Sequence, residues 1–228
     1  RHSTAPRQYW HADTVPLSAH NWNKCAHALI LVDDYTRMTF AYLIKSKNQY
    51  DVAAALEQHF LHQRPASSGV KGINFFLHRT QLRSDRGSEF INATVQRLCE
   101  RIGCIQEYSS PGQLGKYQNG VVERKIKEIG KMCRSMMYSS GLPHHGTAYC
   151  LLQAVDICNA LPTTANPADP DDPTTDVTGY SPYYTYYGSI PSIDNYHVFG
   201  SFVTVHLDED HRDPDAPNVQ AAPCVYLC

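Results

Sequence analysis

The chain has 228 residues, of which 42% are hydrophobic and 18% charged, and its formal net charge is −2 at pH 7. This composition is typical of a globular protein with a buried core and argues against a disordered chain. No stretch approaches the ~20 apolar residues of a membrane span, and the small net charge gives no global sign of nucleic-acid binding, so any DNA contact must come from a local basic surface.

The N-terminus and the cysteines indicate a compartment. Residues 1–10 lack the apolar core of a signal peptide and the chain does not begin with Met, so we expect an intracellular piece of a longer polypeptide. The eight cysteines are scattered, several in apolar segments, which predicts reduced, buried thiols. His59 and His62, with Cys99 and Cys104 far downstream, are the nearest approach to a zinc cluster, but zinc sites have tighter spacing and core or surface roles are favoured.

The first part of the chain predicts three strands and a helix, over Tyr9–Thr14, Ala26–Val32, Met38–Ile44 and Asp51–Phe60. The second run is almost continuously apolar, as in a strand buried on both faces. Asp33 and Asp34 then form the turn into an antiparallel return strand.

The second part predicts alternating strands and helices, over Gln81–Ser84, residues 92–102, Cys104–Tyr108, Asn119–Ser139 and Thr147–Ala160. Asn92 can cap the first of these helices and Gly103 can end it. The long helix has apolar residues at steps of four and three, which is an amphipathic pattern. The fold class predicted is therefore α/β, a mixed sheet with helices on its faces.

The chain also divides into segments. We expect a core domain over residues 5–162, a linker or insertion rich in Pro, Asp and Thr over 163–194, and a small β module over 195–228 that includes a strand near Phe199–Leu207. The tyrosines between Tyr180 and Tyr187 could stack on bases, although packing of the linker against the core is the favoured interpretation.

Three acidic residues occur where the predicted structure changes type. Asp13 lies in the first strand, Asp85 just after a strand and Glu123 near the start of the long helix. Converging carboxylates can hold two Mg²⁺ ions about 3.5–4 Å apart for an in-line displacement at a phosphodiester. A single Asp or Glu at such a place is more often a cap or a turn former, so spacing alone leaves both interpretations open.

Several stretches resemble the integrase core of copia-type long-terminal-repeat retrotransposons, which are related to retroviral integrases. They are WHADT (Trp10–Thr14), LILVDDYTR (Leu29–Arg37), LRSDRGSEF (Leu82–Phe90), QNGVVERKIKEIGKMCRSMM (Gln118–Met137), NALPT (Asn159–Thr163) and Ser181–Leu207. The last stretch resembles the segment after the core and the start of an SH3-like β module. The resemblance covers nearly the whole chain.

The resemblance implies an RNase H-like, mixed five-stranded sheet and places the family's catalytic, metal-binding triad on Asp13, Asp85 and Glu123. It implies an enzyme, a polynucleotidyl transferase and endonuclease that trims the 3′ ends of the element's DNA and joins them to target DNA with Mg²⁺ or Mn²⁺, two ions in the active complex. No zinc is expected in this fragment, because the family's His/Cys module precedes the core. DNA and a homo-oligomer are the implied partners, without a membrane, and the host nucleus is the expected place of action.

Basic and polar residues near the triad are the expected DNA contacts, namely Lys116, Gln118, Asn119, Arg124, Lys127, Lys131 and Arg134. A charged helix face is often simply exposed to solvent. Beside a site that must accept a polyanion, however, contact with phosphate groups is an equal alternative. Asp33 or Asp34 could replace Asp13 as the first carboxylate, yet two acids before Tyr-Thr-Arg are typical of a turn. Glu89 is a further acid, interpreted as a loop or helix-start residue.

Two departures from the family pattern favour a second hypothesis. Arg86 stands where the family usually has Asn, and the spacing from Asp85 to Glu123 is slightly longer than usual. The alternative is a degenerate or domesticated integrase relic that binds nucleic acid or protein without catalysis. A third, more distant alternative is a cut-and-paste transposase, against which the stretch from Ser181 onward argues.

Overall fold

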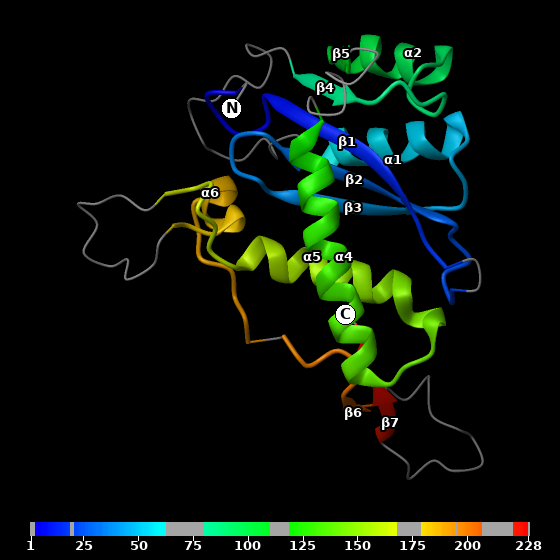
Figure 1. Cartoon of the computed structure of the whole chain (residues 1–228), viewed down its shortest axis with the longest axis vertical. Helices are drawn as coiled ribbons and strands as arrows, with labels where there is room; N and C mark the ends of the chain where they lie inside the picture. Colours follow the sequence, from blue (N-terminus) through cyan, green and yellow to red (C-terminus); the bar gives the residue numbers. More distant parts are fainter. Residues whose placement is uncertain are drawn as a thin grey trace.

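The computed structural model describes residues 3–18, 21–62, 80–109, 119–167, 179–194, 196–206 and 221–227. Its strands are β1 (Tyr9–Pro16), β2 (His27–Asp33), β3 (Thr39–Ile44), β4 (Gln81–Ser84), β5 (Ile105–Tyr108), β6 (Phe202–His206) and β7 (Ala221–Val225). Its helices are α1 (Gln49–His62), α2 (Ala93–Ile102), α4 (Gly120–Ser140), α5 (Thr147–Ala160) and α6 (Pro182–Tyr187), with a 3₁₀ turn, η1 (His144–Gly146) (Figure 1).

The five-stranded sheet confirms the predicted fold class. Its order is β3-β2-β1-β4-β5, with β1, β2 and β3 antiparallel and β1, β4 and β5 parallel. β1 is thus the central strand and joins the antiparallel half to the parallel half. Because parallel strands end at one edge, residues at the ends of β1 and β4 are brought together from distant parts of the sequence.

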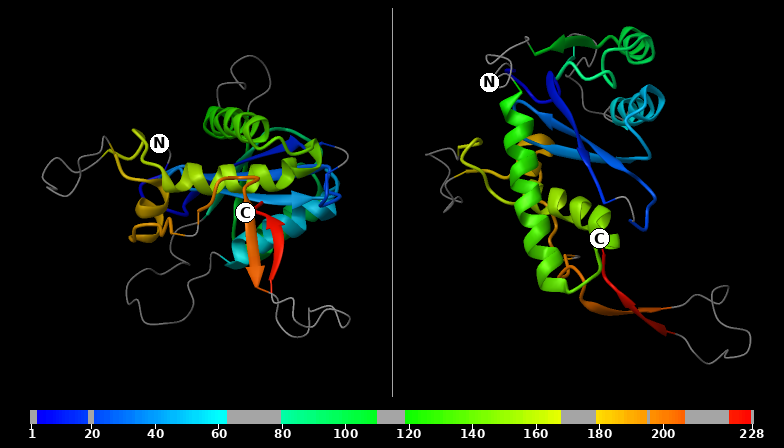
Figure 2. Two further views of the ribbon diagram at one scale, coloured as in Figure 1. Left: turned by 90° about the horizontal axis from the view of Figure 1, so that it is seen from below. Right: turned by 45° about the vertical axis from the view of Figure 1, so that its right-hand side comes forward.

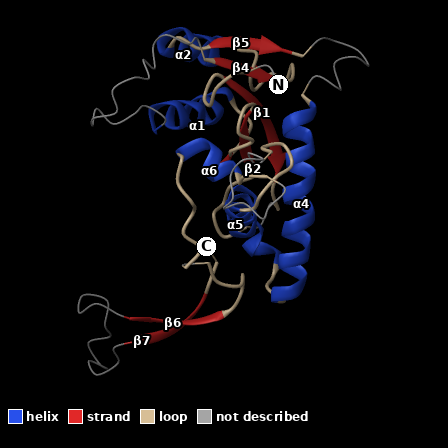
Figure 3. Cartoon of the chain, turned by 90° about the vertical axis from the view of Figure 1, so that its left-hand side faces the viewer, coloured by secondary structure: helices blue, strands red, loops and turns tan. Residues whose placement is uncertain are grey.

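Helices cover both faces of the sheet. Figure 3 shows α1 and α2 on one side of the strands and α4 on the other, and Figure 2 shows the same separation from other directions. Alternation along the strands divides the core accordingly. Trp10, Leu29 and Leu31 pack with α1 and α2, whereas Ile30 and Val32 pack with α4 and α5.

The helix boundaries follow the predicted signals at α2 and differ slightly elsewhere. The Asn92 side chain accepts a hydrogen bond from the Val95 N–H at 2.9 Å, and Gly103 ends the helix at φ 73°. β1 extends two residues beyond its predicted end, and α1 begins two residues before its predicted start, because the Asn48 side chain caps it by accepting from the N–H groups of Tyr50 and Asp51.

The C-terminal part contains a short helix and a two-stranded ribbon. α6 carries Tyr186, which is buried against Trp10 and Phe40, so packing is confirmed for this member of the tyrosine cluster. β6 and β7 form an antiparallel pair that lies beyond the far end of α4 (Figure 1). An SH3-like module over 195–228 and the boundaries of the linker stay predictions. No helix among the residues described combines the length and apolarity needed to cross a membrane.

Candidate active site

Asp13 and Asp85 lie on adjacent strands of the sheet. The parallel register pairs Tyr9 with Gln81 and His11 with Arg83. Continuing this register by two residues brings Asp13 beside Asp85, which directly follows β4. Asp13 is half-buried, and Asp85 is exposed with its Oδ1 accepting a hydrogen bond from the Gly87 N–H at 3.0 Å.

Glu123 comes from the first turn of α4, and Asn119 holds the start of that helix. The Asn119 Nδ2 donates to the Ala12 carbonyl at 3.1 Å, and its Oδ1 lies 3.4 Å from the His11 Nδ1. The Glu123 N–H donates to the Asn119 carbonyl at 3.2 Å, which is the first helical bond. The start of α4 is therefore tied to the residue that precedes Asp13.

The electrostatics of Asp13 connect the three carboxylates. The pKa of Asp13 is raised from 3.8 to about 6, chiefly by burial and in smaller part by the charges of Asp85 and Glu123. The Thr14 N–H, which donates to Asp13 Oδ1 at 2.7 Å, and the charge of Lys47 oppose this rise. The charges of Asp85, in the loop after β4, and of Glu123, in α4, therefore repel the Asp13 carboxylate. Together with burial, this repulsion disfavours the ionised form of Asp13.

These residues suit a divalent cation by their chemistry. Mg²⁺ prefers oxygen ligands and binds through a few carboxylates while keeping several waters. A cation beside Asp13 would offset both its desolvation and its repulsion from Asp85 and Glu123. Among the residues that the structure describes, no three His, Cys, Asp or Glu side chains stand close enough to hold a metal ion as they are placed. The carboxylates are thus neighbours that would have to close around an ion.

Glu89 makes specific contacts with Thr14 and Lys47, which a solvent-exposed loop acid would lack. Its Oε1 accepts from the Thr14 hydroxyl at 3.2 Å and lies 3.4 Å from the Lys47 Nζ. A Cβ at Gly87 would lie 3.1 Å from Asp85 Oδ1 and closer still to the Glu89 carboxylate. A side chain at this position would therefore displace the Glu89 carboxylate from its present place. Sequence reasoning missed Lys47, because its contact with Glu89 depends on the tertiary fold.

Asp33 and Asp34, the alternatives for the first carboxylate, both make hydrogen bonds or ion pairs with other residues of the protein. The Asp33 carboxylate accepts from the Thr36 N–H at 2.8 Å and from the Arg7 N–H at 2.8 Å. Asp34 lies 3.1 Å from both the His11 Nε2 and the Arg37 guanidinium. Both are buried, as turn-forming residues. Sequence reasoning also missed His11 as a neighbour of the site, although its place two residues before Asp13 puts both side chains on one strand face.

The residues predicted to contact DNA differ in their exposure to solvent. Lys116 and Gln118 lie outside the described residues. Asn119 is only 4% exposed and its amide is engaged with His11 and Ala12, so a DNA contact there stays a prediction. The exposed cations of α4 are Arg124, Lys127, Lys131 and Arg134. Arg86 turns back, with its Nε donating to the Ser109 carbonyl at 3.1 Å.

His59, one of the residues considered as a zinc ligand, lies in the core of the protein. This side chain is buried beside Trp10 and Phe40, and its Nδ1 lies 3.0 Å from the Tyr42 hydroxyl. The thiols of Cys99 and Cys104 are buried on the α2 side of the sheet. These contacts are those of core residues.

The raised pKa of Asp13 predicts a pH dependence of stability in the metal-free chain. Because the folded state holds this proton more tightly than the unfolded state, the contribution of Asp13 to the free energy of unfolding is fully present below pH 3.8 and is lost as the pH rises to about 6. Asp13→Asn is therefore expected to become more stable relative to wild type across this window. Urea unfolding in EDTA at stepped pH measures the difference, with the exposed Asp194→Asn as control. A difference that does not change with pH would contradict the assignment.

Known proteins similar to this chain include an integrase core family and retrotransposon polyproteins. The family model described as "Integrase core domain" matches residues 3–113, which include Asp13 and Asp85 but not Glu123. The truncated transposon Ty1-A Gag-Pol polyprotein of Saccharomyces cerevisiae is 27% identical over 150 residues, covering 64% of this chain and 11% of the polyprotein. The transposon Ty1-NL2 Gag-Pol polyprotein of the same yeast is also 27% identical over 150 residues, covering 64% of this chain and 8% of the polyprotein. By these matches the chain is similar to the integrase cores of copia-type retrotransposons.

The fold of this chain agrees with that of a solved structure. The HTLV-2 integrase catalytic core domain, in complex with magnesium in a trimeric form, superimposes with a TM-score of 0.54 at 15% identity, covering 81% of this chain and 99% of that one. The RNase H-like architecture of this chain is thereby established. The polyproteins it resembles are much longer than the matched region, so the activity and partners of the whole protein are matters for proposal.

Proposed function

We propose that this chain is a retrotransposon integrase core that trims DNA 3′ ends and transfers them to target DNA, with Asp13, Asp85 and Glu123 as its metal-binding carboxylates. The single observation that carries the proposal is geometric: the parallel register of β1 and β4 brings Asp13 beside Asp85, and Asn119, at the start of the helix that carries Glu123, bonds to the Ala12 carbonyl next to Asp13. A half-buried carboxylate repelled by two others has little structural use. It has a clear use where a divalent cation must be bound.

The chain's own residues have distinct tasks in this reaction. Asp13 and Asp85 would hold one end of the site from the rigid sheet, and Glu123 would close it from α4. Bound Mg²⁺ or Mn²⁺ supplies activation of the attacking oxygen and charge stabilisation of the leaving oxygen. Thr14 and Lys47 hold Glu89 beside the site, and Asn119 fixes the helix that carries Glu123.

DNA is the proposed partner, held by phosphate contacts from the exposed cations of α4. Arg124, Lys127 and Lys131 lie along one outer surface of the helix. Such contacts position DNA without reading its sequence. Because two DNA ends are joined to one target, a working complex of at least two copies is proposed, acting in the host nucleus.

The test is a strand-transfer assay with the full chain, a short duplex carrying a recessed 3′ end and labelled target DNA. Joined product is expected with Mg²⁺ or Mn²⁺ and none in EDTA. A chain that is folded by circular dichroism but yields no product with either metal, over a range of protein concentrations and duplex sequences, would overturn the proposal.

The second candidate is a relic that keeps the fold but not the chemistry. It is favoured by the separation of the acids, since no metal-binding cluster is formed among the described residues. A Mn²⁺ titration by calorimetry discriminates the two. An active core takes up Mn²⁺ in a manner that Asp13→Asn and Asp85→Asn weaken, whereas a relic shows no carboxylate-dependent uptake.

A further inference from the structure

His11 forms a buried connection between two segments that are distant in the sequence. It lies on β1, is 1% exposed, and has its Nε2 at 3.1 Å from the Asp34 Oδ1. Its Nδ1 is 3.4 Å from the Asn119 Oδ1. Carboxylate and amide oxygens only accept, so a ring that donates from both nitrogens satisfies both contacts. His11 therefore joins the turn after β2 to the residue that precedes α4.

The Asn119 side chain is turned away from the helix that it precedes. An asparagine at such a position usually accepts a hydrogen bond from an N–H of the first helical turn, as Asn92 does at the start of α2. Asn119 makes no such bond. Its Nδ2 instead donates to the Ala12 carbonyl at 3.1 Å, which leaves its Oδ1 to face His11. This amide thus connects α4 to β1 instead of capping the helix.

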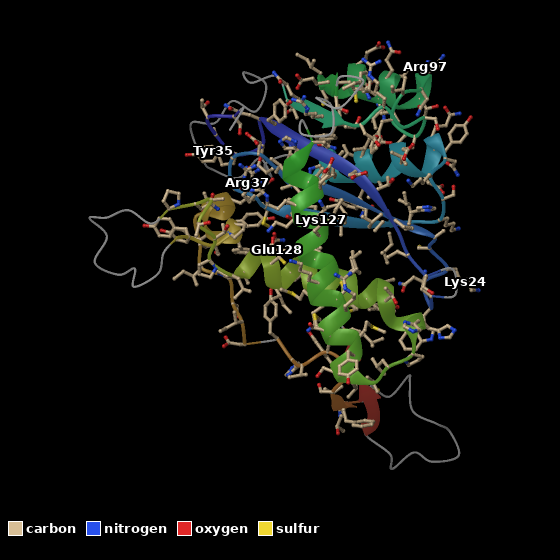
Figure 4. The ribbon with its side chains drawn as sticks, viewed as in Figure 1. Lys24, Tyr35, Arg37, Arg97, Lys127 and Glu128 are labelled. Atoms are coloured by element: carbon tan, nitrogen blue, oxygen red, sulfur yellow. The ribbon has the colours of Figure 1, made fainter. Side chains whose placement is uncertain are left out.

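The other end of the connection is fixed in the turn after β2. Asp34 is 1% exposed and lies 3.1 Å from the guanidinium of Arg37, which is in the same turn (Figure 4). The Asp34 Oδ2 accepts from both the N–H and the hydroxyl of Ser3, each at 3.1 Å. The carboxylate that faces His11 is therefore held from several sides, and it gives the imidazole a fixed support.

We propose that His11 is a positioning residue, which fixes the first turn of α4, and with it the Glu123 carboxylate, relative to Asp13. This inference rests on the proposed function. The Glu123 N–H donates to the Asn119 carbonyl at 3.2 Å, so a shift of Asn119 moves Glu123. Asp13 lies two residues after His11 on the central strand of the sheet. One buried imidazole thus acts on the separation of two of the proposed metal-binding carboxylates.

Stability alone gives little reason for this buried polar chain. Replacing buried ionic groups by well-packed apolar residues of similar volume is often neutral or stabilising, because burial removes the polar groups from water. Carboxylates that must close around an ion, by contrast, need supports whose own rotamers are locked by packing and hydrogen bonds. The contacts of His11 and Asn119 supply such a support on the helix side of the site.

Two substitutions of His11 separate its two contacts. The amide nitrogen of Asn reaches about as far as the Nδ1 of His, so His11→Asn keeps a donor toward Asn119. The amide nitrogen of Gln reaches about as far as the Nε2, so His11→Gln keeps a donor toward Asp34 instead. We expect His11→Gln to lower the kcat of strand transfer by about 100-fold, as for a misplacement of about 1 Å, and His11→Asn to lower it by less than about tenfold. The KM for DNA should change in neither variant.

Hydrogen exchange of the full chain in EDTA tests the start of α4 without metal or DNA. The Glu123 N–H makes the first helical bond, and its exchange should be about fivefold faster in His11→Gln, as for the loss of one hydrogen bond. In His11→Asn it should stay near the wild-type rate. His59→Gln is the matched control, at a buried histidine beside Trp10 on the other face of β1. It should change neither this exchange rate nor the kcat per folded molecule.

Asn119→Ala provides the same test if the His11 variants do not fold. Because the Asn119 side chain does not cap α4, alanine removes only the connection to β1, and the Glu123 N–H should again exchange about fivefold faster. Asn92→Ala is its control, since it removes a true cap from α2 and should leave the Glu123 N–H unchanged.

Two results would overturn the positioning role. One is an equal kcat per folded molecule in His11→Gln and His11→Asn, and the other is a wild-type exchange rate of the Glu123 N–H in both His11→Gln and Asn119→Ala. Because the exchange rates need neither metal nor DNA, a chain that shows the expected rates but joins no DNA refutes the proposed function alone. A chain that joins DNA equally well in both His11 variants refutes the positioning role alone.

Discussion

Replacing Asp85 by Asn is expected to reduce strand transfer by about 1,000-fold or more while the fold is kept. Metal ions contribute several kcal/mol of charge stabilisation to such a transition state, and each ~1.4 kcal/mol is a factor of ten in rate. The side chain is exposed, and its Oδ1 accepts a hydrogen bond from the Gly87 N–H, which an Asn oxygen can equally accept. Activity and folding are therefore separable at this position.

Glu123→Gln should show the same loss from the helix side of the site. Removing either charge also lessens the repulsion on Asp13, so the melting temperature of both variants in EDTA should equal or exceed that of wild type. Asp194→Asn and Glu100→Gln, at exposed carboxylates outside the site, are the matched controls and should retain activity. Assays with Mg²⁺ and Mn²⁺ measure the effect, and wild-type rates in both variants would remove these acids from the mechanism.

The fold was predictable where local pattern and tertiary structure agree. The apolar run of β2 is buried on both faces because helices cover both sides of the sheet. Asn92 and Gly103 marked the ends of α2 through cap chemistry that depends on neighbouring residues only. α6 was not predicted, because its six residues carry no periodic pattern and are held by Tyr186 packing on Trp10.

The sequence predicts a set of candidate site residues but not their contacts. The motifs predict Asp13, Asp85 and Glu123, and the strand register places the first two side by side. The Lys47–Glu89 pair joins residues far apart in the chain, for which a single sequence has no signal. Asn119 illustrates the difference, since a residue expected to face DNA holds the start of α4.

Trp10→Ala is expected to lower the free energy of unfolding by about 3–5 kcal/mol, a large share of the ~5–15 kcal/mol that stabilises a typical domain. Trp10 is 1% exposed and heads the fully buried side chains by volume. Its ring centroid lies 4.3 Å from that of His59 and 5.8 Å from that of Phe40, so truncation would empty the space where β1, α1 and β3 meet.

Trp22→Ala is the matched control, because Trp22 is 47% exposed and only about half of its side chain is removed from water. Its cost should be about half as large. The chain has two tryptophans, so each variant keeps one as a fluorescence probe during urea unfolding. Trp10 and Asp13 point to opposite faces of β1, so a shift of the strand towards the vacated core would draw Asp13 away from Glu123. Strand transfer by Trp10→Ala should therefore fall by more than its loss of folded molecules, and an equal fall would show that β1 keeps its position without this side chain.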